Sequence, residues 1–177
     1  MYVTDPHASM DFALSDVQKQ VRDEVRRFAD NEIRPVATEY DQREEFPHEV
    51  MDKAVEMGLV GSSIPVEYGG AGYDYLTNII LVEELFAADP GIGLCISSAA
   101  FGADALEAFG TEEQKEEYLR PIAEGEAIMG SAISEPDVGS DVSSVSTSAE
   151  LDGDEWVIDG NKMWITNGSV GDYFVVL

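Results

Sequence analysis

The sequence predicts an α+β protein, in which an all-α helical domain precedes the start of a β domain. Two patterns in the 177 residues indicate this order. Through the first two thirds of the chain, apolar residues recur at helical spacing, and capping patterns stand at helix starts. From Ala127 onward, short β-branched runs alternate with Asp-Gly and Asn-Gly turns, as in strands joined by hairpins. We therefore expect a helical domain over residues 1–125 and a partial β domain over residues 126–177.

Two helices are expected near the amino terminus. Ser15 and Gln18 form a capping-box pattern at the start of the first. Its apolar stripe consists of Val17, Val21, Val25 and Phe28. Pro35 should end or kink this helix, because a proline ring clashes with the preceding turn. A short second helix should follow Pro47, with Gly58 at the position after its carboxyl end.

The glycine-rich segment 68–72 invites comparison with a phosphate-binding loop. Its spacing fits neither the dinucleotide fingerprint nor the P-loop, so we expect a plain loop. Asp74 should cap the helix that follows. That helix is apolar on more than one face, which predicts a buried helix broken at Pro90.

Two more helices complete the helical domain. A run of apolar and small residues predicts a helix over residues 92–109, closed by Gly110. Thr111 and Gln114 form a second capping box, and the helix that they start should extend to about Ala123.

The remaining residues predict short strands. Residues 142–148 alternate in part, residues 152–154 should turn, and residues 156–158 should form a strand. Residues 162–166 are expected to form a strand paired with the preceding one, and residues 173–177 a further strand. Because the chain ends on its most apolar strand, which would leave an unpaired edge, we expect a truncated protein.

Charge is the main compositional feature. The chain has 36 acidic residues against 10 Lys and Arg, a formal net charge of -26. Nucleic acid and anionic membrane surfaces are poor partners for such a protein, because both bind clustered Lys and Arg. The acidic residues are spread along the chain, which is typical of a well-solvated surface. The sharper hypothesis is adaptation to high salt, where counterions screen self-repulsion.

Other features narrow the class of protein. Cys95 is the single cysteine, so we expect neither an intrachain disulfide nor a cysteine-based metal site, and no metal centre is predicted. No apolar run is long enough to span a membrane. The segment Met1–Phe12 lacks the pattern of a secretory signal, so the expected location is the cytoplasm.

Two segments carry the candidate chemistry. Residues 132–141 place the hydroxyls of Ser134 and Ser140 around Gly139, an arrangement suited to an acceptor-rich ligand, although such segments are usually turns. On a strand, Trp164 and Thr166 would point to one face and suit a planar heteroaromatic ligand. An ordinary core tryptophan explains that spacing equally well.

These two segments together resemble the signatures of the acyl-CoA dehydrogenase family of flavoproteins. Residues 132–141 are similar to its A-x-(T/S)-E-P-x-x-G-S-D motif, and residues 160–167 to its G-x-K-x-W-I-T-N motif. The resemblance extends to 65–72, 83–85 and 109–115. It implies the family's helical domain and the start of its β-barrel-like middle domain, with the carboxyl-terminal helical domain absent.

The resemblance implies an FAD-dependent enzyme that oxidises an acyl-CoA thioester to trans-2-enoyl-CoA and passes electrons to an electron-transfer flavoprotein. Relatives are usually homo-oligomers, so the complete protein is expected to be one. Two alternatives remain open. One is a superfamily oxidase or monooxygenase that uses O₂. The other is a non-catalytic fragment of a split protein that binds acyl-CoA or a partner chain.

Site residues follow from the resemblance position by position. The flavin contacts would be Ile133, Ser134, Trp164, Ile165 and Thr166. The acyl-CoA contacts would be Ser131, Ser140, Leu94, Ser97 and Phe101, the last three on one helix face. The catalytic base is expected beyond Leu177, so the 177-residue chain alone should be inactive. Glu135 is expected to be a structural acceptor and not this base.

Overall fold

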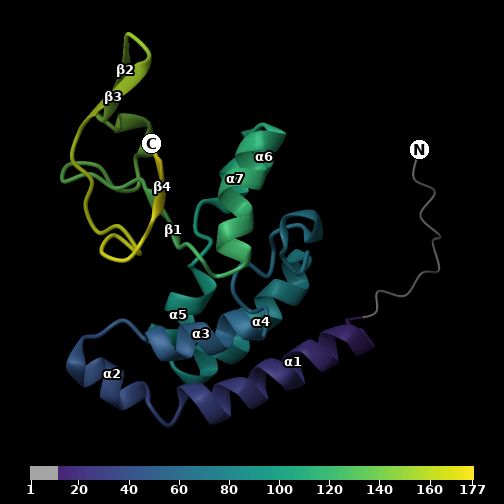
Figure 1. Ribbon diagram of the computed structural model, residues 1–177. Helices are drawn as coiled ribbons and strands as arrows, with labels where there is room; N and C mark the ends of the chain where they lie inside the picture. Colours follow the sequence, from purple (N-terminus) through teal and green to yellow (C-terminus); the bar gives the residue numbers. More distant parts are fainter. Residues whose placement is uncertain (1–11) are drawn as a thin grey trace.

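The computed structural model describes residues 12–177 and confirms the predicted order of a helical part followed by the start of a β part (Figure 1). The prediction about Met1–Phe12 concerns a segment that, apart from Phe12, lies outside the described residues. The helices are α1 (Asp16–Phe28), α2 (Ala37–Arg43), α3 (His48–Glu56), α4 (Tyr75–Ala88), α5 (Pro90–Ser97), α6 (Ala103–Phe109) and α7 (Glu112–Ala123). The strands are β1 (Met129–Ala132), β2 (Ser148–Asp152), β3 (Glu155–Asp159) and β4 (Tyr173–Val176). Short turns are π-helical at η1 (Ala29–Ile33) and 3₁₀ at η2 (Val66–Tyr68) and η3 (Val142–Ser144).

The helix starts follow the predicted capping chemistry. The Ser15 hydroxyl accepts a hydrogen bond from the Gln18 backbone N–H at 3.2 Å, and the Gln18 side chain accepts from the Ser15 N–H. Thr111 and Gln114 form the same reciprocal pair at α7. The Asp74 carboxylate caps α4 through the N–H of Thr77 at 2.8 Å. Each cap satisfies backbone donors that a helix start leaves without intrahelical partners.

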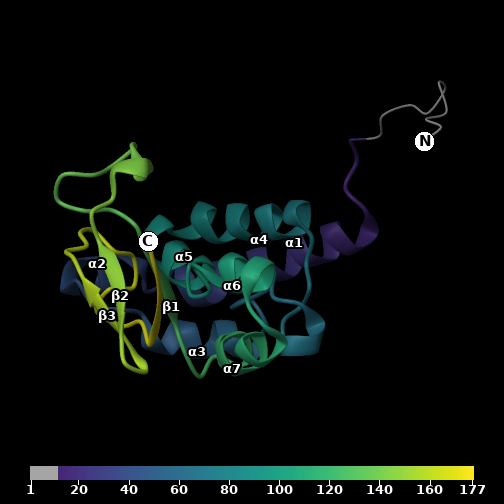
Figure 2. The same cartoon turned by 90° about the horizontal axis from the view of Figure 1, so that it is seen from above.

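Two hydrophobic clusters form the core. The first lies where α1, α3, α4 and α5 meet, and α1 runs beside α4 (Figure 2). Its fully buried side chains include Val25, Ile33, Leu81, Leu85 and Ile96. The second joins α6 and α7 to β1 through Ile64, Leu119, Ile122 and Met129. Because β1 is built into this second cluster, the helical part holds the start of the β part in place.

The glycine-rich segment is a loop, as its spacing predicts. Gly69 has a φ of +92° and ends the η2 turn. The N–H groups of Gly70 and Gly72 donate to the carbonyl oxygens of Pro65 and Ile64. These donors are engaged within the loop itself, which agrees with a structural role.

Two predictions about the helices are wrong in part. One face of α4 is exposed, because nothing in residues 12–177 covers it; Ile79, for example, is 59% exposed. The helix predicted over residues 92–109 is broken between α5 and α6. The break has a physical cause: the Met129 N–H donates to the Ala99 carbonyl oxygen at 2.8 Å, which draws that backbone toward β1. Gly102 then turns the chain with a φ of +124°.

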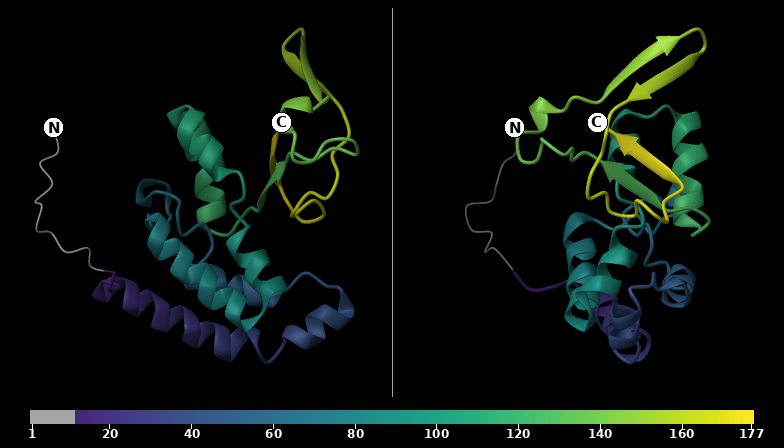
Figure 3. Two further views of the ribbon diagram at one scale, coloured as in Figure 1. Left: turned by 180° about the vertical axis from the view of Figure 1, so that it is seen from behind. Right: turned by 90° about the vertical axis from the view of Figure 1, so that its left-hand side faces the viewer.

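The strands form two separate pairs. β1 and β4 are parallel, with Met129 opposite Tyr173, whereas β2 and β3 form an antiparallel hairpin that projects away from the helices (Figure 3). Gly153, with a φ of +66°, makes the predicted turn between them. Residues 142–148 are a 3₁₀ turn and a loop up to the start of β2, not a strand. Residues 162–166 form a loop, so the predicted strand there is wrong.

Among the helices of residues 12–177, none has both the length and the apolar character that crossing a membrane requires.

Candidate functional site

The two motif segments lie against each other. One follows β1 and the other precedes β4, and these two strands are hydrogen-bonded neighbours. The Met163 N–H donates to the Ser134 carbonyl oxygen at 2.9 Å, and the Lys162 ammonium donates to the Ile133 carbonyl oxygen at 3.0 Å. Parts of the chain about thirty residues apart in sequence are thus joined at one edge of the β1–β4 pair.

Glu135 is a buried hydrogen-bond acceptor. One carboxylate oxygen accepts from the N–H and hydroxyl of Ser146 at 2.8 and 2.6 Å. The other accepts from the N–H and hydroxyl of Thr147, and from the Lys162 ammonium at 2.9 Å. These hydrogen bonds, those from Ser146 and Thr147 first, hold the pKa of Glu135 far below its usual range. Both oxygens of Glu135 are therefore engaged, so Glu135 is a structural acceptor in this fold.

Trp164 is the most unusual residue of this region. It has a left-handed backbone with a φ of +60°, and its side chain is 88% exposed. Left-handed backbone costs a bulky residue roughly 1–3 kcal/mol, and such strain concentrates at ligand clamps. The segment is a loop because Lys162 is drawn into the Glu135 ion pair before Trp164, and Asn167, with a φ of +64°, turns the chain after it. Because residues 162–166 form a loop and not a strand, alternation along a strand no longer predicts that the Trp164 and Thr166 side chains point to the same face.

Asn167 fixes the far end of this loop. Its side-chain amide donates to the carbonyl oxygens of Ser98 at 2.8 Å and Met129 at 3.0 Å. Close packing at the same place requires Gly130, because a β-carbon there would lie 2.9 Å from the carbonyl oxygen of Thr166. Ile165 and Thr166 are half-buried between these anchors.

The residues predicted to contact acyl-CoA fall into three places. The Ser131 hydroxyl on β1 donates to the Phe101 carbonyl oxygen at 3.3 Å, which brings those two together. Leu94 and Ser97 lie on α5, but Phe101 lies in the turn beyond it. The prediction that all three share a helix face is therefore wrong, because the helix ends where β1 approaches. Ser140 lies apart from them, exposed in the segment after the 135–138 turn.

The chemistry of these residues fits a planar heteroaromatic group. Trp164 offers an exposed indole, and Met163 beside it is 38% exposed. Ser134 and Thr166 supply hydroxyls that can donate or accept. An aromatic wall next to such hydroxyls can bind the ring of a flavin by stacking and hydrogen bonding. Within residues 12–177, no cluster of three or more His, Cys, Asp or Glu side chains is arranged to hold a metal ion.

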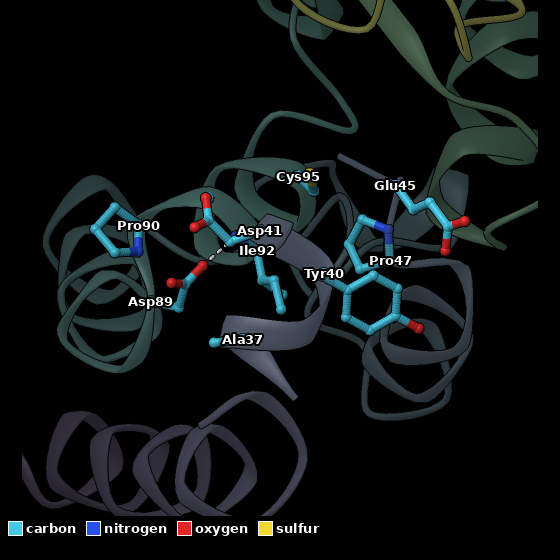
Figure 4. A pocket seen from close by; sticks show the side chains of 10 residues that line it. Ala37, Tyr40, Asp41, Glu45, Pro47, Asp89, Pro90, Ile92 and Cys95 are labelled. Atoms are coloured by element: carbon cyan, nitrogen blue, oxygen red, sulfur yellow. Dashed lines mark hydrogen bonds between the residues drawn. The ribbon is translucent and has the colours of Figure 1, made fainter. Parts of the chain in front are cut away.

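A separate cavity of about 360 Å³ lies between α2, the segment that leads into α3, and the start of α5 (Figure 4). Tyr40 and Ile92 give it an apolar part, and the acidic residues Asp41, Glu45 and Asp89 line it as well. Asp89 caps α5 through the Ile92 N–H at 2.8 Å, so part of this acidity serves the helix. None of the predicted site residues lines the cavity.

Three polar residues of the site lay outside the predicted contacts. They are Glu135, Lys162 and Asn167, which hold the two motif segments together and against α5. One feature of the sequence indicates the ion pair between Glu135 and Lys162: the two residues have opposite charge, and each motif contains one of them. The sequence alone does not predict their contact, because a strand over residues 162–166 places no constraint on the Lys162 side chain.

The fold and site define a class of protein: a helical part leads into the start of a β part, and the loop before β4 exposes the Trp164 indole. Residues 15–126 match the family described as acyl-CoA dehydrogenase, N-terminal domain, and residues 130–177 match acyl-CoA dehydrogenase, middle domain. The chain belongs to the acyl-CoA dehydrogenase family. Members of this family use FAD.

Individual relatives agree. A short-chain-specific acyl-CoA dehydrogenase of Clostridium acetobutylicum is 45% identical over 94% of this chain and 44% of its own length. A chain solved in work on the electron-transferring flavoprotein of Acidaminococcus fermentans is 40% identical, with a TM-score of 0.89 over 94% of this chain and 44% of that one. Glutaryl-CoA dehydrogenase of Mycobacterium smegmatis in complex with FADH₂ is 31% identical, with a TM-score of 0.86 over 92% and 42%. This chain therefore spans less than half the length of these relatives.

Proposed function

We propose that this chain is part of the catalytic unit of an FAD-dependent acyl-CoA dehydrogenase. The reaction would convert an acyl-CoA thioester to trans-2-enoyl-CoA, with electrons passed on to an electron-transfer flavoprotein. The observation that carries the proposal is the exposed, left-handed Trp164 in a member of this family. Its neighbour Met163 is hydrogen-bonded to the Ser134 carbonyl oxygen. Similarity to a chain solved in work on an electron-transferring flavoprotein supports the choice of electron partner.

In this proposal the two motif segments hold the flavin ring. Trp164 stacks on it, Ile133 and Ile165 pack near it, and the hydroxyls of Ser134 and Thr166 donate to its polar edge. FAD, when bound, supplies the hydride acceptor of the reaction. The chain's own contribution is to orient the ring and to direct donors at atoms that gain charge on reduction.

The acyl-CoA contacts are proposed at the neighbouring junction of helix and strand. Ser131 and Phe101 are already linked there, and Leu94 and Ser97 approach from the end of α5. Ser140, on its exposed turn, would contact the pantetheine or phosphate part of the substrate. The catalytic base is proposed to lie outside this chain, which spans 44% of the Clostridium acetobutylicum relative. Glu135 is not proposed as the base, because its carboxylate is fully engaged.

Further parts of the proposal concern the complete protein. We propose a cytoplasmic homo-oligomer with a salt-adapted acidic surface, in which residues 1–125 and 126–177 belong to separate domains. Because the base and part of the FAD site would lie elsewhere, residues 1–177 alone should bind little flavin and be inactive.

The proposal is tested by titrating the full-length protein with FAD and recording its visible spectrum. Wild-type protein should bind FAD stoichiometrically, and Trp164→Ala should bind at least about tenfold more weakly, equivalent to about 1.4 kcal/mol of lost stacking. The matched control is Trp156→Ala, which removes an indole that is 67% exposed on β3, near the turn of the β2–β3 hairpin. Equal FAD affinity in wild type and Trp164→Ala would contradict the proposed wall.

A second experiment separates dehydrogenase from oxidase. The flavin should be bleached by an acyl-CoA without air, and an electron-transfer flavoprotein should restore its colour faster than O₂ does. Faster restoration by O₂ would favour the oxidase alternative.

A further inference from the structure

The two motif segments are joined by a buried ion pair. The Lys162 ammonium lies 2.9 Å from a Glu135 carboxylate oxygen, and their side chains are only 13% and 3% exposed. By contrast, each of the other ion pairs found among residues 12–177 has at least one partner whose side chain is more than 30% exposed. Within residues 12–177, Lys162–Glu135 is thus the ion pair whose two side chains are both mostly buried.

Each partner of the ion pair also forms hydrogen bonds with backbone groups. Lys162 donates to the Ile133 carbonyl oxygen at 3.0 Å, so its ammonium binds both sides of the Ser134 position. Glu135 binds the N–H groups of Ser146 and Thr147, which lead into β2. Three stretches of chain, at residues 133–135, 146–147 and 162–163, are therefore organised around two charges.

Stability alone explains this arrangement poorly. Replacing a buried ion pair by apolar side chains of similar volume is often neutral or stabilising, because desolvation offsets the attraction between the charges. The ion pair instead fixes a distance. The hydrogen bonds of Lys162 to Ile133 and Glu135 hold residue 163 next to residue 134, where the Met163 N–H binds the Ser134 carbonyl oxygen. Groups that position ligand contacts need such supporting hydrogen bonds to hold them within a fraction of an ångström.

We propose that Lys162 and Glu135 are positioning residues that set the spacing of the Ser134 and Trp164 flavin contacts and balance the charge beside the flavin ring. The inference rests on the proposed function and deepens it. Neither side chain needs to touch the cofactor. Their effect passes through the backbone of Ile133, Ser134 and Met163, which they hold.

Charge removal gives the pair a signature that simple loss of structure lacks. Lys162→Met leaves the Glu135 carboxylate unbalanced, which disfavours adding electrons to a nearby flavin and should lower its reduction potential. Glu135→Gln leaves the Lys162 ammonium unbalanced and should raise it. A purely structural pair would shift the potential in neither variant, or in the same direction in both.

The experiment uses the full-length protein with FAD, and measures FAD affinity and flavin reduction potential. We expect Lys162→Met to weaken FAD binding at least about tenfold, the potentials to move in opposite directions in the two variants, and Lys162→Arg to restore most of the affinity. The control is Lys19→Met, which breaks an exposed ion pair with Asp16 on α1. Unchanged affinity and potential in Lys162→Met and Glu135→Gln, or potentials that move together, would overturn the inference.

Two further measurements keep the result unambiguous. If Lys162→Met does not fold, the isosteric Glu135→Gln and the charge-conserving Lys162→Arg still test the inference. The flavin reduction potential should rise in Glu135→Gln and stay unchanged in Lys162→Arg. Amide hydrogen exchange at Met163 should be at least about tenfold faster in Glu135→Gln than in wild type, because that N–H is bound to Ser134. If the wild type itself binds no FAD, the proposed function fails, whereas binding by wild type and equal behaviour of the variants would sink only this inference.

Discussion

The side-chain amide of Asn167 donates a hydrogen bond to the backbone carbonyl oxygen of Ser98, 2.8 Å away. A second donation reaches the carbonyl oxygen of Met129 at 3.0 Å. Asn167 adopts a φ of +64°, a conformation that asparagine tolerates better than most residues. One side chain therefore joins the loop after Trp164 to the end of α5 and to β1.

Replacing Asn167 should destabilise the protein to an extent that depends on the replacement. Asn167→Asp loses both donors and points a carboxylate at two carbonyl oxygens, so we expect a loss of about 2–3 kcal/mol of unfolding free energy. Asn167→Gly loses the same donors but accepts the positive φ without strain, and should lose less. Urea unfolding measures both, and an Asp variant as stable as the Gly variant would contradict the assigned hydrogen bonds.

Gly70 and Gly139 should respond differently to the same substitution. A β-carbon at Gly70 would lie 2.0 Å from the Ile64 carbonyl oxygen, whereas nothing lies within 4 Å of one at Gly139. Gly70→Ala must therefore displace the backbone and should cost about 2–3 kcal/mol or prevent folding. Gly139→Ala should stay within about 0.5 kcal/mol of wild type in thermal unfolding. A stable Gly70→Ala protein would show that the 68–72 loop is packed less closely.

The Tyr68 hydroxyl donates to a Glu112 carboxylate oxygen at 2.7 Å and predicts a defined pH dependence. This hydrogen bond and burial raise the pKa of Tyr68 to about 12, and the same bond lowers the pKa of Glu112. A raised pKa gives stability that is present below the unfolded value near 10 and is lost as the pH rises toward 12. The lowered pKa of Glu112 gives stability that is present above its unfolded value and is lost on acidification.

The stability difference between wild type and Tyr68→Phe should therefore be largest near neutral pH and shrink between about pH 10 and 12. Urea unfolding at several pH values measures it. Tyr75→Phe is the control, because it removes a hydroxyl from a side chain that is 84% exposed. A difference that stays constant to pH 12 would show that the Tyr68–Glu112 bond is not formed.

Local chemistry determined which elements could be predicted. The capping boxes at Ser15 and Thr111 need only residues three positions apart, and both form as the sequence predicts. The helical stripe is likewise a local pattern: Val21, Val25 and Phe28 are buried as predicted, whereas Val17 in the first turn is 64% exposed. The order of helical and β parts follows from such local patterns, so the fold class can be predicted from the sequence.

The wrong predictions concern segments whose backbone conformation depends on contacts with residues far away in the sequence. Residues 162–166 have the composition of a strand, but Lys162 is held by Glu135, and Asn167 by Ser98. The helix over residues 92–109 breaks because Met129 binds the carbonyl of Ala99. No pattern within either segment contains these contacts. The site residues could thus be proposed from motif resemblance, while the arrangement that supports them became visible only in the fold.

The β2–β3 hairpin contains an unfavourable cross-strand pair. Asp152 lies opposite Glu155 in the antiparallel register. Like charges directly opposite each other destabilise a strand pair, and opposite charges contribute roughly 0.2–1 kcal/mol. Glu155→Lys should therefore protect the hairpin amides from hydrogen exchange at low salt, and this gain should fade as salt screens the pair. Glu155→Gln, which removes charge without creating attraction, is the control and should give a smaller gain.

The response to salt depends on which electrostatic effect is larger. Exposed ion pairs such as Arg34–Asp30 weaken in salt, which would lower stability, but each contributes only about 0–1 kcal/mol. With 36 acidic residues and 10 cations, repulsion among unpaired carboxylates should outweigh that loss. We expect the urea midpoint to rise between dilute buffer and about 1 M KCl, where the screening length falls to about 3 Å. Sucrose, which stabilises without screening charge, is the control. Equal stability in dilute buffer and in KCl would reject adaptation to salt and leave the acidic surface as a solvation feature.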